Sequence, residues 1–306
     1  MKKYKILLML IAIGLGSVSC EDYTDGINVD PNNFTSAPGN LIVGQAELVV
    51  VVLSGSNSSR FAGMWTDQFT GSDRQYITVN NYGVTASDFD DVWDDVYADG
   101  AAQARIAKDA GAESGDVLLE GVATIMEAIL MGETAALFGD IPYRTAFDYT
   151  TNPDPTYDGQ AQVLGDVQGL LSQALAKVGS AATVASVYGA PVFVANDATW
   201  EEVIHSLKAR YFMITKEYAS AHGEALQGIS SANGDLLSSH SSASGARNLY
   251  YQFIIQERGG YLTANGSNLA NLMTGERERE LETPGDAVRF DYYFETKHEL
   301  SAKQLS

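Results

Sequence analysis

DATWEEVIHSLKARYFM, residues 197–213, is the stretch that decides the fold, because it combines a helix start signal with a helical repeat. Thr199 and Glu202 have the spacing of a capping box, in which two side chains satisfy the first free N–H groups of a helix. Behind them, apolar and aromatic residues recur every three or four positions, as on one face of a helix. The repeating residues, which we expect in the core rather than in a binding site, are Trp200, Val203, Leu207, Tyr211, Ile214 and Tyr218.

The helical period also recurs in four other segments, which are Asn40–Leu53, Ser87–Lys108, Asp116–Phe138 and 160–177. In the first of them the β-branched run Val49–Val52 would equally suit a strand. Other strand patterns are confined to Tyr188–Val194 and Tyr250–Ile255. The sequence therefore predicts a mainly α fold of paired antiparallel helices, with long loops and little β structure.

The segment Asp116–Phe138 has two different faces. Apolar side chains recur along one face at helical spacing, whereas Glu120, Thr124 and Glu127 lie on the opposite face. This pattern is typical of an amphipathic helix that packs against neighbours through its apolar face.

The N-terminus has the pattern of an export signal. Residues 1–20 read MKKYKILLMLIAIGLGSVSC, with a basic start and an apolar run, Ile6–Leu15, that is too short to span a bilayer. The only cysteine, Cys20, follows a run of small residues, and this arrangement resembles the lipobox of bacterial lipoproteins, in which the cysteine is acylated. Several acyl chains on one residue would anchor the protein stably in a membrane.

These features predict three parts of the chain. We expect a lipoprotein signal peptide at 1–19, a lipidated N-terminus and tether at 20–38, and one helical domain at 39–306. The acidic pair that follows Cys20, Glu21 and Asp22, resembles a signal that sends some lipoproteins to the cell surface. We therefore expect an exported, lipid-anchored protein that faces outward.

Composition excludes several classes of protein. Lys and Arg number 19 against 39 Asp and Glu, giving a net charge of −20, which argues against binding to nucleic acid. A single cysteine excludes internal disulfides and zinc sites with several cysteines. The four histidines lack metal-ligand spacing, and neither a P-loop nor a nucleophile elbow is present. We therefore expect no metal, no cofactor and no catalytic residue, although a pair of glycosidase carboxylates cannot be recognised from sequence.

One polar stretch is rich in aromatic residues. Residues 65–89 read WTDQFTGSDRQYITVNNYGVTASDF and hold Trp65, Arg74, Tyr76 and Tyr82 among Gly, Ser, Thr, Asn and Asp. A sugar offers an apolar C–H face and a rim of hydroxyl groups, which suit an aromatic platform beside hydrogen-bonding side chains. The alternative is that these aromatics pin a long loop onto the helices, and composition does not decide between the two.

Several motifs in chain order resemble the SusD/RagB family of outer-membrane lipoproteins. Besides Cys20 and residues 197–213, they are NVDPNNFTSAP (28–38), MWTDQFTGSDRQY (64–76), FGDIPYRTAF (138–147) and PTYDGQAQVLGDVQGLLSQAL (155–175). The resemblance implies a fold of tetratricopeptide-type antiparallel helix hairpins and a non-catalytic role. Such proteins capture oligosaccharides, in some cases peptides, and work with a TonB-dependent transporter of the SusC type.

By the same resemblance, Trp65, Arg74, Tyr76 and Tyr82 would contact the ligand, whereas Trp93 and Trp200 match structural helix positions. Family members are usually much longer, so we expect the chain to be a C-terminally truncated member. Two other hypotheses remain at this stage. One is a helical scaffold that binds proteins and no sugar, and the other is a lipid-anchored glycoside hydrolase.

Overall fold

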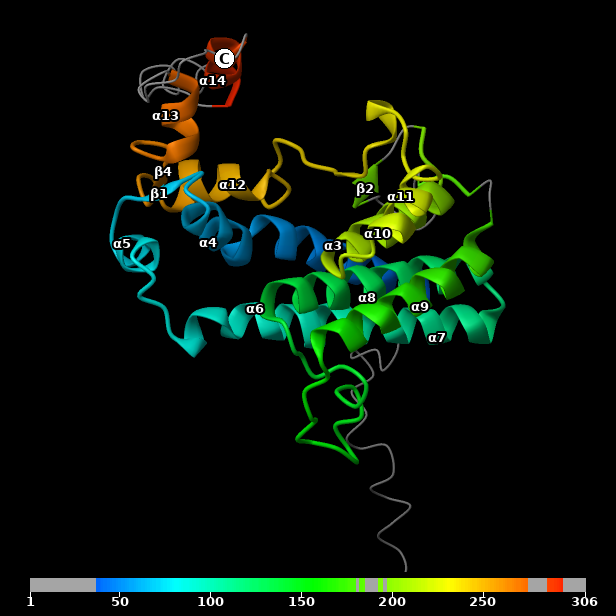
Figure 1. Ribbon diagram of the computed structural model, residues 1–306. Helices are drawn as coiled ribbons and strands as arrows, with labels where there is room; N and C mark the ends of the chain where they lie inside the picture. The colour runs from blue at the N-terminus through cyan, green and yellow to red at the C-terminus, as the bar shows by residue number, and fades with distance from the viewer. Residues whose placement is uncertain (1–36, 180–181, 185–191, 195–196, 275–284, 294–306) are drawn as a thin grey trace, which may run out of the picture. The chain divides into compact units, whose positions relative to one another are not determined.

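The computed structural model describes residues 37–179, 182–184, 192–194, 197–274 and 285–293 (Figure 1). Its chain divides into two compact units, Met1–Pro38 and Gly39–Ser306, and nearly all described residues belong to the second. The expected signal peptide and Cys20 lie outside the described residues.

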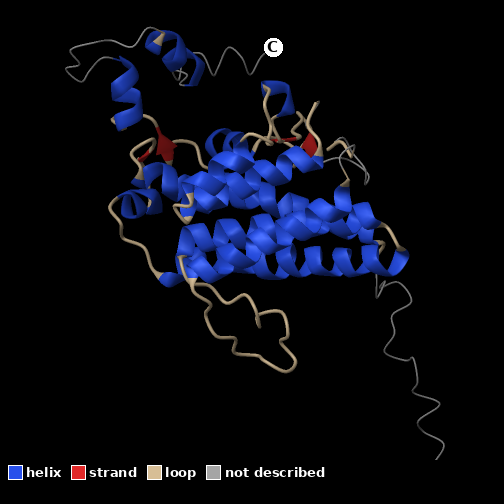
Figure 2. Cartoon of the chain, turned by 45° about the vertical axis from the view of Figure 1, so that its right-hand side comes forward, coloured by secondary structure: helices blue, strands red, loops and turns tan. Residues whose placement is uncertain are grey.

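The long helices form the main body of the second unit and lie side by side (Figure 2). α8 packs against α7 and α9, and it also meets α3 and α10. In chain order, these and the adjoining helices are α3 (Gly39–Gly55), α4 (Asn57–Trp65), α6 (Asp90–Asp94), α7 (Ala102–Ser114), α8 (Val117–Phe138), α9 (Gln160–Val178), α10 (Trp200–Ile214) and α11 (Tyr218–Ala225).

α3 is a helix throughout, including the β-branched run that would also suit a strand. Val43, Val49, Val50 and Leu53 are buried on one side of it, where they join the main hydrophobic core. Packing of an amphipathic face contributes more to helix stability than intrinsic propensity does. The helical interpretation of Asn40–Leu53 is therefore confirmed.

The predicted helix Ser87–Lys108 is a series of connected helical segments. A short 3₁₀ turn, η1 (Ala86–Phe89), leads into α6, and a π-helical segment, η2 (Asp95–Ala101), joins α6 to α7. The helix ends at Gly115, whose φ of 74° is the left-handed conformation that glycine adopts easily. Asp116 then caps α8 by accepting a hydrogen bond from the Leu119 N–H at 3.0 Å.

α8 is buried on both of its faces. By length and composition it could cross a membrane, as could Gly39–Trp65, but most of α8 lies inside the protein, as in the core helix of a globular domain. Thr124 and Glu127, from the polar face, are buried as well as the apolar positions. The helix is therefore amphipathic in sequence but surrounded by neighbours in the fold.

The capping box that opens α10 is confirmed. Thr199 Oγ1 accepts a hydrogen bond from the Glu202 N–H at 3.3 Å, and Glu202 Oε2 accepts one from the Thr199 N–H at 2.8 Å. Trp200 and Tyr211 are buried in the core, as expected. The prediction for Tyr218 is wrong, because the helix ends at Ile214 and Tyr218 starts α11 as an exposed side chain.

In the described part of the chain the strands form two short antiparallel pairs, and two isolated bridges join Ile141 to Asp158 and Thr183 to Thr199. β1 (Thr70–Gly71) pairs with β4 (Leu262–Thr263), and β2 (Phe193–Val194) pairs with β3 (Leu237–Ser238). Of the predicted strand Tyr188–Val194, the last two residues form β2, and residues up to 191 lie outside the described ranges.

The predicted strand Tyr250–Ile255 is wrong, because this segment is helical. α12 (Leu249–Tyr251) continues into a π-helical segment, η4 (Gln252–Glu257). Asn248 Oδ1 accepts hydrogen bonds from the N–H groups of Tyr250 and Tyr251 and so starts the helix. The remaining short helices are α5 (Gln75–Asn80), η3 (Ala232–Gly234), α13 (Asn268–Thr274) and α14 (Asp286–Tyr293).

Candidate functional site

The polar stretch that follows α4 is more ordered in structure than a plain loop. It contains β1 and α5, and it packs onto a hydrophobic cluster that is separate from the main core. Residues from distant parts of the sequence meet there because β1 pairs with β4. The buried members of this second cluster are Phe61, Met64, Tyr76, Val79, Phe253, Tyr261 and Leu262.

Tyr76 lies inside the second cluster rather than on the surface. Its side chain is 4% exposed, and its ring centroid lies 5.2 Å from that of Phe253. Its hydroxyl accepts a hydrogen bond from Arg60 Nε at 2.9 Å. Burial raises the pKa of the Tyr76 hydroxyl, and the Arg60 charge opposes that rise. Tyr76 therefore holds α5 against α4 and offers no ring face to a ligand.

Arg60 is the buried cation of this cluster. Its Nη2 donates to Asn57 Oδ1 at 2.8 Å, and its guanidinium carbon lies 4.1 Å from the centre of the Phe253 ring. A cation over an aromatic face is stabilised by the ring quadrupole, more strongly when both are desolvated. Arg60 thus links α4 both to α5, through Tyr76, and to η4.

Trp65 and Tyr82 form a stacked pair at the surface. Their ring centroids are 6.0 Å apart and the ring planes differ by 23°. Trp65 is anchored, because its Nε1 donates to the Val79 carbonyl at 2.9 Å and its ring contacts Phe61 and Phe89. Tyr82 is 69% exposed. The pair is therefore a flat aromatic platform, in which Trp65 is fixed by the protein and Tyr82 is open to solvent.

The backbone of Tyr82 supports this arrangement. Its φ of 61° lies in the left-handed region, which is uncommon for a residue with a large side chain. Its N–H donates to the Val79 carbonyl at 2.9 Å, the same oxygen that accepts from Trp65. One carbonyl therefore fixes both members of the pair.

Arg74 lies at the other end of α5. It precedes the helix with a φ of 46°, its side chain is largely exposed, and its Nε lies 3.9 Å from Asp73 Oδ2. Six helical residues span about 9 Å, and Arg74 and Tyr82 flank opposite ends of α5. The structure brings Trp65 and Tyr82 together but places Arg74 apart from them.

Sequence reasoning missed several residues that build this region. Phe61 could have been found, because it lies four positions before Trp65 on one helix, where side chains meet. Arg60, Phe253 and Tyr261 gave no local signal, since their partners are distant in sequence or buried.

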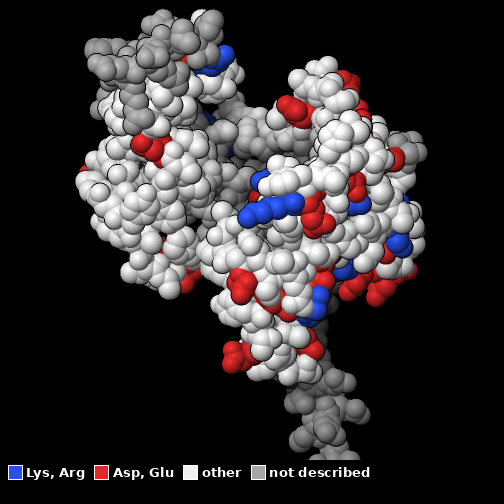
Figure 3. Space-filling model, in the orientation of Figure 1, with Lys and Arg blue, Asp and Glu red and all other residues white. Residues whose placement is uncertain are grey.

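On the face seen in Figure 3, the surface over α4 and α5 carries few charged side chains.

Trp93 and Trp200 belong to the main core. Trp93 stacks on Tyr97 with ring centroids 5.3 Å apart, and Trp200 is almost fully buried. Within the described ranges, no group of three or more His, Cys, Asp or Glu side chains is placed to hold a metal ion.

These features define the class of protein as a domain of helical hairpins that displays an anchored aromatic pair. The family described as "Starch-binding associating with outer membrane" (SusD-like) matches residues 31–244. The chain belongs to this SusD-like family, and the resemblance noted in the sequence is confirmed.

Solved structures agree with this assignment. A SusD/RagB family protein from Bacteroides thetaiotaomicron is 23% identical, with a TM-score of 0.61 over 78% of this chain and 52% of that one. A chitin-binding protein is 20% identical, with a TM-score of 0.53 over 70% of this chain and 48% of that one. A SusD homologue from Bacteroides fragilis is 16% identical, with a TM-score of 0.53 over 79% of this chain and 50% of that one.

At these identities the likeness concerns the fold, and the mainly α, SusD-like fold expected from the sequence is confirmed. The chain spans about half the length of the solved structures that it matches. No curated protein matches it.

Proposed function

We propose that the protein captures oligosaccharides at the surface of the outer membrane and passes them to a TonB-dependent transporter of the SusC type. Membership of a family described as starch-binding and associated with the outer membrane supports this proposal. One similar structure is that of a chitin-binding protein, which supports a glycan ligand further. The observation that carries the proposal is the stacked pair of Trp65 and exposed Tyr82.

The pair would bind a sugar ring through its C–H face. A sugar that stacks on Tyr82 removes apolar surface from water without requiring Tyr82 to move, because Trp65 already holds the ring. On the face seen in Figure 3, few charged side chains lie over α4 and α5, which suits a neutral glycan. Arg74, at the other end of α5, would hydrogen-bond the hydroxyl groups of another sugar of the same chain.

The proposed role is binding without turnover. Stacking and hydrogen bonding hold a sugar without breaking a bond, and members of the SusD-like family are binding proteins. Of the four residues expected to contact the ligand, Trp65, Arg74 and Tyr82 keep that role in the proposal. Tyr76 becomes the residue that positions α5.

The location of the protein is part of the same proposal. Acyl chains on Cys20 would anchor it in the outer membrane, and the acidic pair Glu21 and Asp22 would direct it to the outer face. The tether would then hold the domain close to the transporter that receives the glycan.

Calorimetric titration with maltooligosaccharides and chitooligosaccharides tests the proposal. We expect Tyr82→Ala to weaken binding about tenfold to a hundredfold, because one aromatic side chain buried by the ligand contributes about 1.5–3 kcal/mol. Tyr82→Phe keeps the ring and should retain most of the affinity. Tyr149→Ala removes another tyrosine, 77% exposed, from the loop between α8 and α9 and should change nothing.

Three outcomes would contradict the proposal. Equal losses in Tyr82→Ala and Tyr149→Ala would remove the stacked pair from the site. Release of shorter products during the titration would favour the hydrolase. Capture of a protein partner by both the wild type and Tyr82→Ala, with no glycan bound by either, would favour the scaffold.

A further inference from the structure

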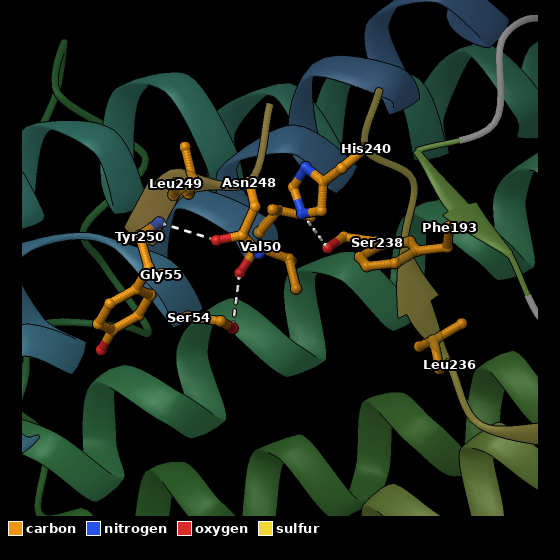
Figure 4. A pocket seen from close by; sticks show the side chains of 11 residues that line it. Val50, Ser54, Gly55, Phe193, Leu236, Ser238, His240, Asn248, Leu249 and Tyr250 are labelled. Carbon is orange, nitrogen blue, oxygen red and sulfur yellow. Dashed lines mark hydrogen bonds between the residues drawn. The ribbon is translucent and has the colours of Figure 1, made fainter. Parts of the chain in front are cut away.

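A pocket opens between α3, the β2–β3 pair and the start of α12 (Figure 4). Its volume is about 260 Å³. Val50, Phe193 and Leu249 supply apolar walls, and Ser54, His240 and Asn248 supply polar groups. We propose that this pocket is a second binding site, which takes one neutral, polyhydroxylated ring of monosaccharide size.

The lining excludes a charged ligand. No Asp, Glu, Lys or Arg side chain is among the eleven residues that line the pocket in the described part of the chain. An anion or cation that entered would lose water and find no opposite charge, which is costly in a partly desolvated site. The ligand that fits is therefore neutral.

The polar groups of the pocket have unused hydrogen-bonding capacity of both kinds. Asn248 Oδ1 accepts from two backbone N–H groups, which leaves the two N–H groups of its amide as donors. Ser54 donates to the Val50 carbonyl at 2.9 Å, which leaves its oxygen as an acceptor. His240 Nε2 shares a hydrogen bond with Ser238 Oγ at 2.8 Å, which leaves Nδ1 available.

This mixture of donors and acceptors matches hydroxyl groups, each of which both donates and accepts. The apolar walls match the C–H face of a sugar ring, which a purely polar ligand lacks. Drug-sized ligands occupy pockets of about 300–1,000 Å³, so a pocket of 260 Å³ suits one ring rather than a chain of them.

A close approach of two elements closes one end of the pocket. A Cβ atom on Gly55 would lie 2.9 Å from Leu249 Cδ1, so the glycine lets Leu249 pack directly on the end of α3 without moving its side chain. The wall formed by α12 is therefore set by contact between the two helices. The pocket contains neither Trp65 nor Tyr82, so this inference does not rest on the proposed function.

Two variants change the pocket without removing its supports. Ser54→Phe fills it from an exposed position on α3. Asn248→Asp keeps an oxygen to cap α12, but it replaces the amide donors with a negative charge.

Each of these two pocket variants has a matched control outside the pocket. Gln45→Phe adds the same ring nine residues earlier on α3, on the opposite side of the helix, and Asn233→Asp adds the same charge at an exposed asparagine.

The experiment is ligand-observed NMR titration of the full chain with glucose, galactose and N-acetylglucosamine. We expect at least one of them to bind with a Kd of about 1–10 mM. Ser54→Phe and Asn248→Asp should each raise that Kd at least about tenfold, whereas Gln45→Phe and Asn233→Asp leave it unchanged. Thermal melts of all four variants establish that they are folded.

Several results would overturn the inference. One is that no neutral monosaccharide binds the folded wild type at about 50 mM, well above the expected Kd. Another is that a sugar binds equally to the wild type and both pocket variants, which would place it elsewhere. A third is that a charged analogue, gluconate or glucosamine, binds more tightly than glucose.

Discussion

Replacing Glu127 by alanine tests how the core helix α8 is held to its neighbours. Glu127 is 1% exposed, and three groups donate to its carboxylate. Arg105 Nε donates to Oε1 at 2.7 Å, and Lys108 Nζ donates to Oε2 at 2.9 Å. The Tyr143 hydroxyl also donates to Oε1, at 3.1 Å. This one side chain therefore joins α8 to α7 and to the segment that follows α8.

The expected cost follows from burial. Removing one partner of a buried ion pair destabilises a protein by about 3–5 kcal/mol, because the remaining charge has lost its counter-ion. The cations at this site are 31% exposed for Arg105 and 28% for Lys108, so both can still reach water. We therefore expect the low end of that range, about 3 kcal/mol of unfolding free energy for Glu127→Ala.

Glu120→Ala is a matched control on the same helix. Glu120 pairs with Lys177 at 2.8 Å, but the two side chains are 20% and 39% exposed. Both substitutions replace Glu by Ala within α8, and Glu120→Ala also removes a charge from its first turn, where the helix dipole adds about 1 kcal/mol or less. An exposed pair contributes about 1 kcal/mol or less, and we expect a cost of that size for Glu120→Ala.

Urea unfolding followed by circular dichroism measures both variants. With a slope of about 3 kcal/mol per molar urea for a chain of this size, 3 kcal/mol lowers the midpoint by about 1 M. The Glu120→Ala midpoint should fall by about 0.3 M or less. Equal midpoints for the two variants would refute the reasoning, because burial of the carboxylate would then make no difference.

Two further changes test other parts of the fold. Burial raises the pKa of Glu47 from 4.5 to about 7, while hydrogen bonding by the Val192 N–H opposes the rise, so the folded state favours the protonated acid. Its contribution to stability is therefore complete below about pH 4.5 and is lost as the pH rises through 7. This loss of stability is about 2 kcal/mol after screening by solvent, and Glu47→Gln should abolish it. Melting curves from pH 4 to 8 measure the effect, and the same pH profile in the variant and the wild type would contradict it. Gly132→Ala would place a Cβ 2.4 Å from Tyr211 Cζ and should lower the free energy of unfolding by about 1–3 kcal/mol. Gly165→Ala, in open space on α9, should raise it by about 0.5–1 kcal/mol. Urea unfolding measures both, and a change of the same sign in the two variants would contradict this packing.

Much of the helical architecture could be predicted because it depends on local patterns. The capping box at Thr199 and Glu202 needs only four consecutive residues, and the start of α10 follows from it. The predicted strand Tyr250–Ile255 failed for a local reason too, since Asn248 supplies a helix cap just before it. Burial of Glu127 could not be predicted, because its cations lie on another helix.

The aromatic stretch shows where local reasoning ends. Tyr76 and Tyr82 are six residues apart in the same polar context, so composition treats them alike. Tyr76 is buried by residues nearly 180 positions away, among them Phe253. The pairing of β1 with β4 brings these residues to it, and a pairing of only two residues leaves no periodic pattern in the sequence. Tyr82 has no such partner among the described aromatic contacts, which pair it with Trp65 alone.

The alternative that aromatics pin this stretch onto the helices holds for Tyr76, whereas sugar binding by Trp65 and Tyr82 is our proposal. Tyr76 pins α5 to the second hydrophobic cluster, and that anchoring fixes the Val79 carbonyl, which lies on the same short helix. The Val79 carbonyl in turn accepts from both Trp65 and Tyr82. A buried aromatic that holds the loop thus restrains the exposed aromatic pair, and under our proposal a sugar would bind that pair with little loss of conformational entropy.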